Sequence, residues 1–208
     1  MDDNVSRLDD APPVPVLNLP NALTVLRLLM VPVFVWLMLV EGTPARWWAL
    51  AVFCVAAATD QLDGHIARSR NLVTDFGKVV DPIADKALTL GAFVMISWDT
   101  GNAWMWAFTV LVAIRELGIT WWRAVLLRRG IVVAANRGGK LKTVLQMLFI
   151  VVMLVPWGAL LGGAAGGTPV AVRVVQVAIG VAALVQTLWS GGVYVVEGMR
   201  MNRSGAQS

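Results

Sequence analysis

Long apolar stretches separated by short polar segments most restrict how this chain can fold. A membrane-spanning helix needs about 20 mainly apolar residues. Only 14% of the 208 residues are charged and the mean hydropathy is +0.71, whereas a soluble domain carries about 25% charged residues. We therefore predict an all-α integral membrane protein with six transmembrane helices. They are expected at about 23–40, 47–68, 79–98, 103–122, 141–161 and 170–196.

The polar ends of the chain enclose a single predicted membrane domain. The first 20 residues are rich in aspartate and proline, which favours an extended segment. No basic segment precedes the first apolar stretch, so we do not expect a cleavable signal peptide. We expect a cytoplasmic N-terminal segment at 1–20, a six-helix membrane domain at 21–198 and a cytoplasmic C-terminal tail at 199–208.

Basic residues are concentrated on one side of the predicted spans. Of the 17 Lys and Arg residues, 12 fall in segments on the side of both termini, while the opposite loops contain only Arg46 and Arg173. Cytoplasmic segments of membrane proteins carry such an excess, so both termini are predicted in the cytoplasm. This asymmetry accounts for the calculated pI of about 9.8, and we expect no nucleic-acid partner.

Four aspartates lie within or beside the second and third apolar stretches. Asp60 and Asp63 are three residues apart, and Asp81 and Asp85 are four apart, so each pair projects from one helix face. One aspartate alone could be a helix cap or a packed hydrogen-bond partner. Four carboxylates facing one another would repel strongly unless cations neutralised them. Oxygen ligands without His or Cys favour Mg²⁺, Mn²⁺ or Ca²⁺, so we predict a two-metal cavity open to the cytoplasm.

The residues around these aspartates are suited to a phosphate-containing ligand. Gly64 and Ala67 leave one helix face bare, and Gly77 relieves crowding on the facing helix. Arg68 adds a fixed cation near the end of its helix. His65 has no partner at metal-ligand spacing, and we expect it to take no part.

The segment from Asp60 to Asp85 reads DQLDGHIARSRNLVTDFGKVVDPIAD. It resembles the signature of the CDP-alcohol phosphotransferases, D-x2-D-G-x2-A-R-x8-G-x3-D-x3-D, at every fixed position. The resemblance implies transfer of a phosphatidyl or similar group from a CDP-linked lipid to an alcohol, with release of CMP and with two divalent cations, Mg²⁺ or Mn²⁺. It also implies a homodimer in contact with membrane lipids in the cytoplasmic membrane of a bacterium, with its active site facing the cytoplasm.

The same resemblance implies roles for the matched positions. Asp60, Asp63 and Asp81 are expected to be metal ligands. Asp85 is expected to be both a ligand and the general base that accepts the proton of the acceptor hydroxyl. The expected contacts to the CDP-lipid are Asp63, Gly64, Ala67, Arg68 and Gly77.

Polar residues in the later stretches indicate the acceptor. Arg115 lies beside Glu116 in the fourth stretch, and Arg137, Lys140 and Lys142 open the fifth. A cationic cluster next to a helix start suits a phosphate dianion, although anchoring at the cytoplasmic surface explains part of the basic loop. An acceptor that carries a phosphate leaves glycerol 3-phosphate and inositol phosphate as candidates.

Shorter segments favour glycerol 3-phosphate. The stretches NLPNALTVLR at 18–27 and GKLKTVLQ at 139–146 are similar to those of family members that use this acceptor. The implied reaction converts CDP-diacylglycerol and glycerol 3-phosphate into phosphatidylglycerophosphate and CMP. By the same resemblance, Asn21 and Thr24 are expected at the CDP-lipid and Arg27 at the acceptor phosphate.

Two alternatives remain at this point. The first is a family member that transfers the same lipid group to inositol phosphate. The second is an ion or proton transporter that uses carboxylates inside the membrane. A transporter would account for the aspartates but not for Gly64, Ala67, Arg68 and Gly77 at their fixed offsets.

Overall fold

The fold is known from a computed structural model in which part of the chain is described. The described residues are 18–69, 75–128, 131, 137–161 and 168–205. For some helical residues only the backbone is described. Their side chains are left out at positions 20, 61–69, 75–79, 137–138 and 202–205. Residues 1–17 of the extended segment expected at 1–20 therefore lie outside the described residues, whereas residues 19 and 20 already belong to the first helix.

The described part of the chain is entirely helical, as predicted. Each of the six expected membrane spans contains a helix. The helices are α1 (Leu19–Leu39), α2 (Thr43–Ser69), α3 (Asp75–Thr100), α4 (Ala103–Arg128), α5 (Arg137–Leu154), α6 (Trp157–Leu160) and α7 (Val170–Gly205).

The fifth expected span is interrupted, so the prediction of one helix to residue 161 was wrong. Helix α5 ends at Leu154, and Pro156 precedes the separate four-residue helix α6. A proline has no backbone N–H and cannot continue the hydrogen-bond pattern of a helix. Helix α7, in contrast, continues beyond the expected end at residue 196 to Gly205.

Two of the helices in the described part are long and apolar enough to cross a bilayer on composition alone. These segments are Asn21–Leu39 within α1 and Val170–Met201 within α7. Helices α2 and α3 carry the aspartate pairs, which lower their mean hydropathy. The structure is thus consistent with a membrane protein, and the six-span arrangement stays a prediction.

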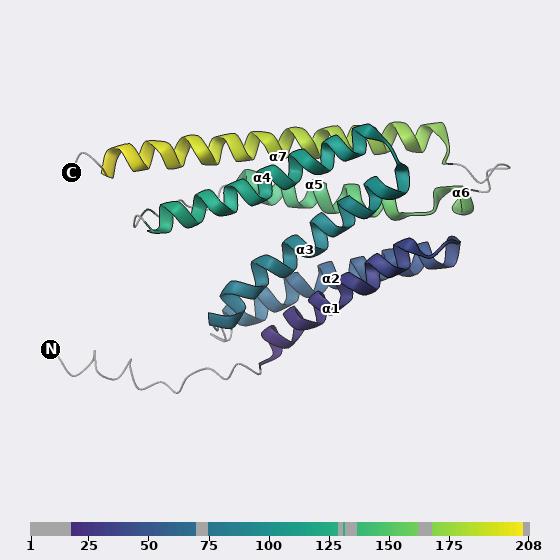
Figure 1. Cartoon of the computed structure of the whole chain (residues 1–208), viewed down its shortest axis with the longest axis horizontal. Coiled ribbons are helices and arrows are strands. Elements are labelled where there is room, and N and C mark those ends of the chain that lie inside the picture. The colour runs from purple at the N-terminus through teal and green to yellow at the C-terminus, as the bar shows by residue number, and fades with distance from the viewer. Residues whose placement is uncertain (1–17, 70–74, 129–130, 132–136, 162–167, 206–208) are drawn as a thin grey trace.

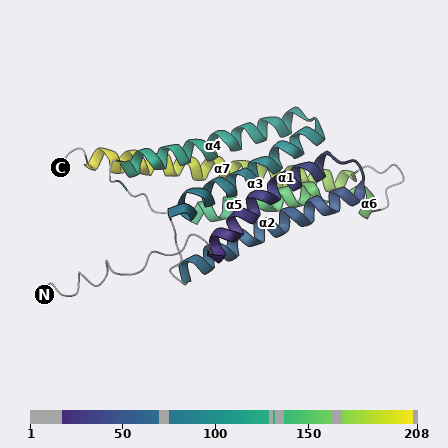
Figure 2. The same ribbon diagram turned by 60° about the horizontal axis from the view of Figure 1, so that its bottom comes forward.

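The helices pack as two groups that α3 connects (Figures 1 and 2). Helix α1 packs against α2 and α3, while α4 and α5 pack against α7. Helix α3 also contacts α4 and α5. Helices α1, α3 and α5 begin, and α2, α4 and α7 end, at the same end of the bundle in Figure 1. We call this the proximal end and the opposite one the distal end.

Aromatic side chains fill the centre of the bundle. Phe93 of α3, Phe108 of α4 and Phe149 of α5 are all buried, and the ring centroids of Phe108 lie 5.1 Å from Phe93 and 4.9 Å from Phe149. Phe34 and Phe53 join α1 to α2 in the same cluster, with centroids 6.0 Å apart. This core fixes how the two helix groups meet.

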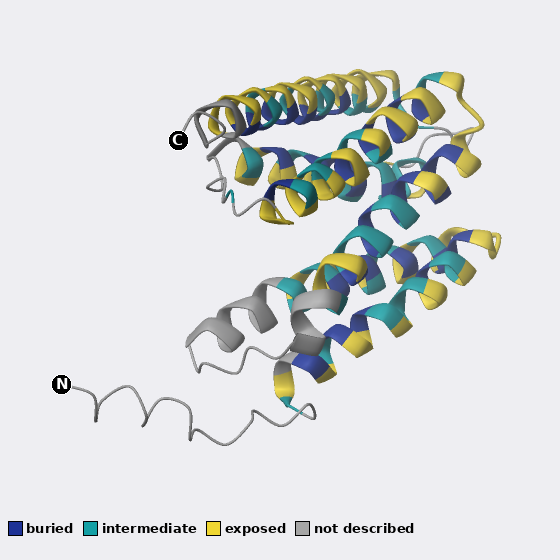
Figure 3. Cartoon of the chain, turned by 60° about the vertical axis from the view of Figure 1, so that its left-hand side comes forward, coloured by how far each residue is buried: buried dark blue, intermediate teal, exposed yellow. Residues whose placement is uncertain are grey.

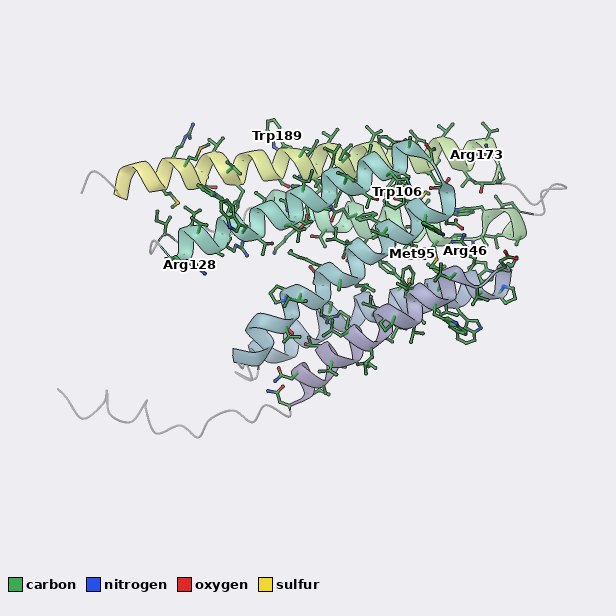
Figure 4. All side chains as sticks on the ribbon, viewed as in Figure 1. Arg46, Met95, Trp106, Arg128, Arg173 and Trp189 are labelled. Atoms are coloured by element: carbon green, nitrogen blue, oxygen red, sulfur yellow. The ribbon has the colours of Figure 1, made fainter. Side chains whose placement is uncertain are left out.

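The outer surface of the bundle is strongly apolar. Trp36, Trp48, Trp98, Trp121 and Trp189 are each at least 63% exposed. Figure 3 shows exposed residues along the outer sides of α4 and α7, with buried residues turned inward, and Trp189 projects outward from α7 in Figure 4. Soluble proteins rarely expose so much apolar surface, so this surface suits contact with lipid.

We predict that Phe108→Ala destabilises the protein because it removes the ring that joins α3, α4 and α5. Such a truncation in a packed core costs about 3–5 kcal/mol. Thermal unfolding in detergent measures the effect. Trp189→Ala is the matched control, since its ring is 70% exposed. An equal fall of the melting temperature in both variants would contradict a core role for Phe108.

Candidate active site

One face of α1 carries three buried polar residues near the proximal end. Asn21, Thr24 and Arg27 are three residues apart, which places them on the same helix face, and they are 5%, 1% and 0% exposed. The side-chain oxygen of Asn18 caps the start of this helix by accepting a hydrogen bond of 2.9 Å from the Asn21 backbone N–H. Burial of a guanidinium in an apolar bundle requires a nearby anion.

The aspartates of α2 and α3 supply that anion and a further acceptor. Arg27 Nη1 lies 2.8 Å from Asp60 Oδ1 of α2. Thr24 Oγ1 donates a hydrogen bond of 2.5 Å to Asp81 Oδ1 of α3. One face of α1 therefore contacts both acidic helices, and the structure brings Asp60 and Asp81 to the same side of the bundle.

The remaining members of the predicted acidic and CDP-lipid site are only partly described. Asp85 is half-buried on α3, one helical turn after Asp81. The side chains at 63, 64, 67, 68 and 77 lie outside the description. Among the side chains that are described, no group of three or more His, Cys, Asp or Glu residues is arranged to hold a metal ion.

A second polar site lies beside Asp85, in a cleft of about 420 Å³ between α3, α4, α5 and α7. Five of its lining side chains are cationic and two are anionic. Its polar lining residues include Asp85, Lys86, Arg115, Glu116, Arg123, Lys140, Lys142, Ser190 and Tyr194.

Glu116 of α4 is the buried anion at the centre of this cationic cleft. It is 8% exposed, and its Oε1 lies 2.6 Å from Lys142 Nζ of α5 and 3.0 Å from Arg115 Nη1. Its Oε2 lies 3.7 Å from Lys86 Nζ of α3. One carboxylate thus contacts cations from three helices.

Helix α7 holds Arg115 from the other side. Arg115 Nε donates to the backbone carbonyl of Thr187 at 3.2 Å, and Nη2 donates to Ser190 Oγ at 3.0 Å. Gln146 of α5 donates a hydrogen bond of 3.0 Å to the Thr187 hydroxyl. Polar residues between membrane helices commonly form such interhelical hydrogen bonds, and here they fix the guanidinium at the wall of the cleft.

Only some of the residues predicted to bind the acceptor phosphate line the cleft. Arg115, Lys140 and Lys142 all line the cleft. The Arg137 side chain lies outside the description. Arg27, which was expected at the acceptor phosphate, is paired with Asp60 and is not among the residues that line the cleft.

The sequence predicts no site role for Lys86, and it leaves open whether Arg123 contacts the substrate or anchors the basic loop at the cytoplasmic surface. Lys86 follows Asp85 directly. Its position inside an apolar stretch could have indicated a functional role, because a charged residue there needs a partner. Arg123 donates a hydrogen bond of 3.2 Å to the Tyr194 hydroxyl, and its guanidinium carbon lies 5.6 Å from the centre of that ring. No sequence signal links Arg123 to Tyr194, because they come from different helices.

We predict that Arg27→Met lowers the free energy of unfolding, because it removes the buried cation beside Asp60. Since the Asp60 side chain is 40% exposed, water can compensate in part, and we expect a loss of about 1–3 kcal/mol. The free energy of unfolding is measured in detergent without added divalent cations. Arg46→Met is the control, because the Arg46–Asp99 pair at the distal end is more exposed. Equal losses would argue against this role for Arg27.

Comparison with known proteins identifies similar sequences from several bacteria. The family model described as CDP-alcohol phosphatidyltransferase matches residues 17–189. A probable phosphatidylglycerophosphate synthase of Mycobacterium tuberculosis is 40% identical over 188 residues, which cover 89% of this chain and 83% of that protein. The CDP-diacylglycerol–glycerol-3-phosphate 3-phosphatidyltransferase of Bacillus subtilis is 39% identical over 150 residues, covering 66% and 76%, respectively.

The matched range contains both parts of the candidate site. It runs from just before α1 into α7, and it includes the aspartates and most of the residues that line the cationic cleft. The resemblance found in the aspartate signature and the match over most of the sequence therefore agree. The chain belongs to the CDP-alcohol phosphatidyltransferase family.

Proposed function

We propose that this enzyme transfers the phosphatidyl group of CDP-diacylglycerol to glycerol 3-phosphate, giving phosphatidylglycerophosphate and CMP. The observation that carries the proposal is the cationic cleft directly beside Asp85. The printed names of the relatives from B. subtilis and M. tuberculosis support the same lipid product. Inositol phosphate stays the alternative acceptor to be excluded by experiment.

The cleft supports binding of an acceptor that carries a phosphate dianion. Its five cationic side chains outnumber its two carboxylates, and Arg and Lys form strong charge-assisted hydrogen bonds with phosphate oxygens. We assign the acceptor phosphate to Arg115, Lys140 and Lys142, with Arg137 as a further member. A phosphate held there leaves the far hydroxyl of a short acceptor free to reach Asp85.

The acidic pairs are suited to hold the two divalent cations that the family resemblance implies. Their donors are carboxylate oxygens from α2 and α3, the ligand type that Mg²⁺ and Mn²⁺ prefer. We assign these cations to Asp60, Asp63, Asp81 and Asp85. Such cations, when bound, would offset the negative charge of the pyrophosphate and of the leaving CMP.

The chain's own residues would carry out the remaining tasks. Asp85 accepts the proton of the acceptor's primary hydroxyl. The hydroxyl oxygen then bonds to the lipid-side phosphorus of CDP-diacylglycerol, and the bond from that phosphorus to CMP breaks. Asn21 and Thr24 on α1 are assigned to the CDP-lipid. The other residues assigned to the CDP-lipid are Asp63, Gly64, Ala67, Arg68 and Gly77.

We further propose that six helices span the cytoplasmic membrane of a bacterium with the proximal end in the cytoplasm. Arg128 lies at the proximal end in Figure 4, whereas Arg46 in the first turn of α2 and Arg173 in the first turn of α7 lie at the distal end. This distribution follows the excess of basic residues in cytoplasmic segments. The homodimer that the family resemblance implies is part of the same proposal, and light scattering in detergent tests it.

An acceptor panel tests the proposed function. Purified protein is incubated with CDP-diacylglycerol and Mg²⁺ together with glycerol 3-phosphate, inositol phosphate or serine, and CMP is measured. We expect CMP only with glycerol 3-phosphate and no activity after chelation of divalent cations. Release of CMP with inositol phosphate alone would overturn the choice of acceptor.

We predict that Asp85→Asn lowers kcat by about 10²–10⁴-fold, the usual contribution of a general base. The amide cannot accept the proton of the acceptor hydroxyl. Binding of CDP-diacylglycerol, measured in detergent by titration, should stay detectable. Near-normal turnover in Asp85→Asn would remove this residue from the role of base.

We predict that Lys142→Ala raises the KM for glycerol 3-phosphate about tenfold or more, as expected for loss of a hydrogen bond to a charged group. The KM for CDP-diacylglycerol should change little. Arg128→Ala is the control, because Arg128 is a cation of α4 outside the lining of the cleft. An equal rise in both KM values would place Lys142 outside the acceptor pocket.

A further inference from the structure

We propose that Glu116 is a positioning residue for the acceptor, which it serves by holding Arg115 and Lys142 in the arrangement that receives the phosphate. The inference rests on the proposed function and extends it to a residue that does not itself bind the substrate. A carboxylate would repel the acceptor phosphate, so its place at the centre of an anion-binding cleft requires an explanation.

The contacts of Glu116 provide that explanation. Its Oε1 accepts from both Arg115 Nη1 and Lys142 Nζ, at 3.0 and 2.6 Å. Two cationic nitrogens on one oxygen atom are close enough to repel each other strongly. The negative charge between them removes this repulsion and draws the side chains of α4 and α5 to one point. Lys86 of α3, at 3.7 Å from Oε2, extends the same arrangement to the helix that carries Asp85.

Burial makes the arrangement specific. Glu116 and Lys142 are each 8% exposed, so water cannot replace either partner fully and the ion pair is favoured over other rotamers. Arg115 also donates through Nε to the Thr187 carbonyl and through Nη2 to the Ser190 hydroxyl, both of α7, and these bonds use only part of its five N–H groups. The guanidinium is thus held on two sides, by Glu116 and by α7. A preorganised anion site loses less conformational entropy when its ligand binds.

A competing role for Glu116 predicts the opposite result. The carboxylate could instead compete with the acceptor phosphate for Arg115 and Lys142. Removal of its charge would then strengthen phosphate binding and lower the acceptor KM. If it positions the cations, removal of the charge lets Arg115 and Lys142 move apart and raises the acceptor KM. The sign of the change therefore distinguishes the two roles.

The main experiment compares Glu116→Gln and Glu116→Asp with the unaltered protein. We expect Glu116→Gln to raise the KM for glycerol 3-phosphate about tenfold, the scale of one lost charge-assisted hydrogen bond, and to leave the KM for CDP-diacylglycerol within about twofold. Glu116→Asp keeps the charge and should recover part of the loss. A fall in the acceptor KM, or equal changes in both KM values, would overturn the proposal.

A double-mutant cycle tests whether Glu116 acts through Lys142. In the Lys142→Ala background, Glu116→Gln should raise the acceptor KM by a smaller factor than in the unaltered protein, because one of the cations that it holds is already absent. Equal factors in the two backgrounds would mean that Glu116 acts independently of Lys142, and the proposed positioning role would then be wrong.

Ser190→Ala keeps the proposal testable if the Glu116 variants do not fold. It removes the hydrogen bond that Arg115 Nη2 donates to Ser190, together with the bond from Ser190 to the Thr187 carbonyl within α7, and should raise the acceptor KM by a smaller factor. Ser97→Ala is the matched control: Ser97 is also buried, but it contacts Thr109 and the backbone carbonyls of Phe93 and Met105, none of which lines the cleft. An unchanged acceptor KM in Ser190→Ala would contradict the proposed positioning of Arg115.

The outcomes separate this inference from the proposed function. If the unaltered protein releases no CMP from CDP-diacylglycerol and glycerol 3-phosphate, the proposed function itself fails. If it does so and the Glu116 and Ser190 variants keep its acceptor KM, only the positioning role fails.

Discussion

Ionised groups between apolar helices must be neutralised by neighbouring helices, because neither lipid nor bulk water replaces their lost hydration. The proximal end contains two such groups, the buried cation Arg27 and the buried anion Glu116, and each has partners of opposite charge. Helix α1 brings Arg27 to Asp60 and the Thr24 hydroxyl to Asp81. Helix α4 brings Glu116 to three cations of the cleft. The relative positions of helices α1 to α5 there thus depend on these polar contacts as well as on apolar packing.

Helix α3 connects the two charged regions. Asp85 and Lys86 are consecutive, and a helix turns by about 100° per residue, so the two side chains leave α3 in different directions. Lys86 Nζ lies 3.7 Å from Glu116 Oε2, and both Asp85 and Lys86 line the acceptor cleft. The residue that we propose as the general base therefore lines the cleft assigned to the acceptor and lies one helical turn from Asp81 of the acidic site.

The centre and the proximal end of the bundle have different compositions for a physical reason. The aromatic cluster of Phe93, Phe108 and Phe149 packs the interior beyond the charged region. Its burial is favourable and does not depend on bound ligands. The proximal end contains charges whose desolvation is costly. A rigid apolar core allows those charges to be kept at fixed positions, where preorganisation of the site favours binding.

The sequence alone determined the local features: which segments are apolar, that each aspartate pair shares a helix face, and which family signature the pairs form. These follow from composition and from the period of the helix, which neighbouring residues decide. Only the tertiary structure decided that Arg27 faces Asp60 and that Glu116 gathers Lys86, Arg115 and Lys142. Those contacts join residues from different helices, and their distances depend on how the helices cross and pack, which no spacing along one helix specifies.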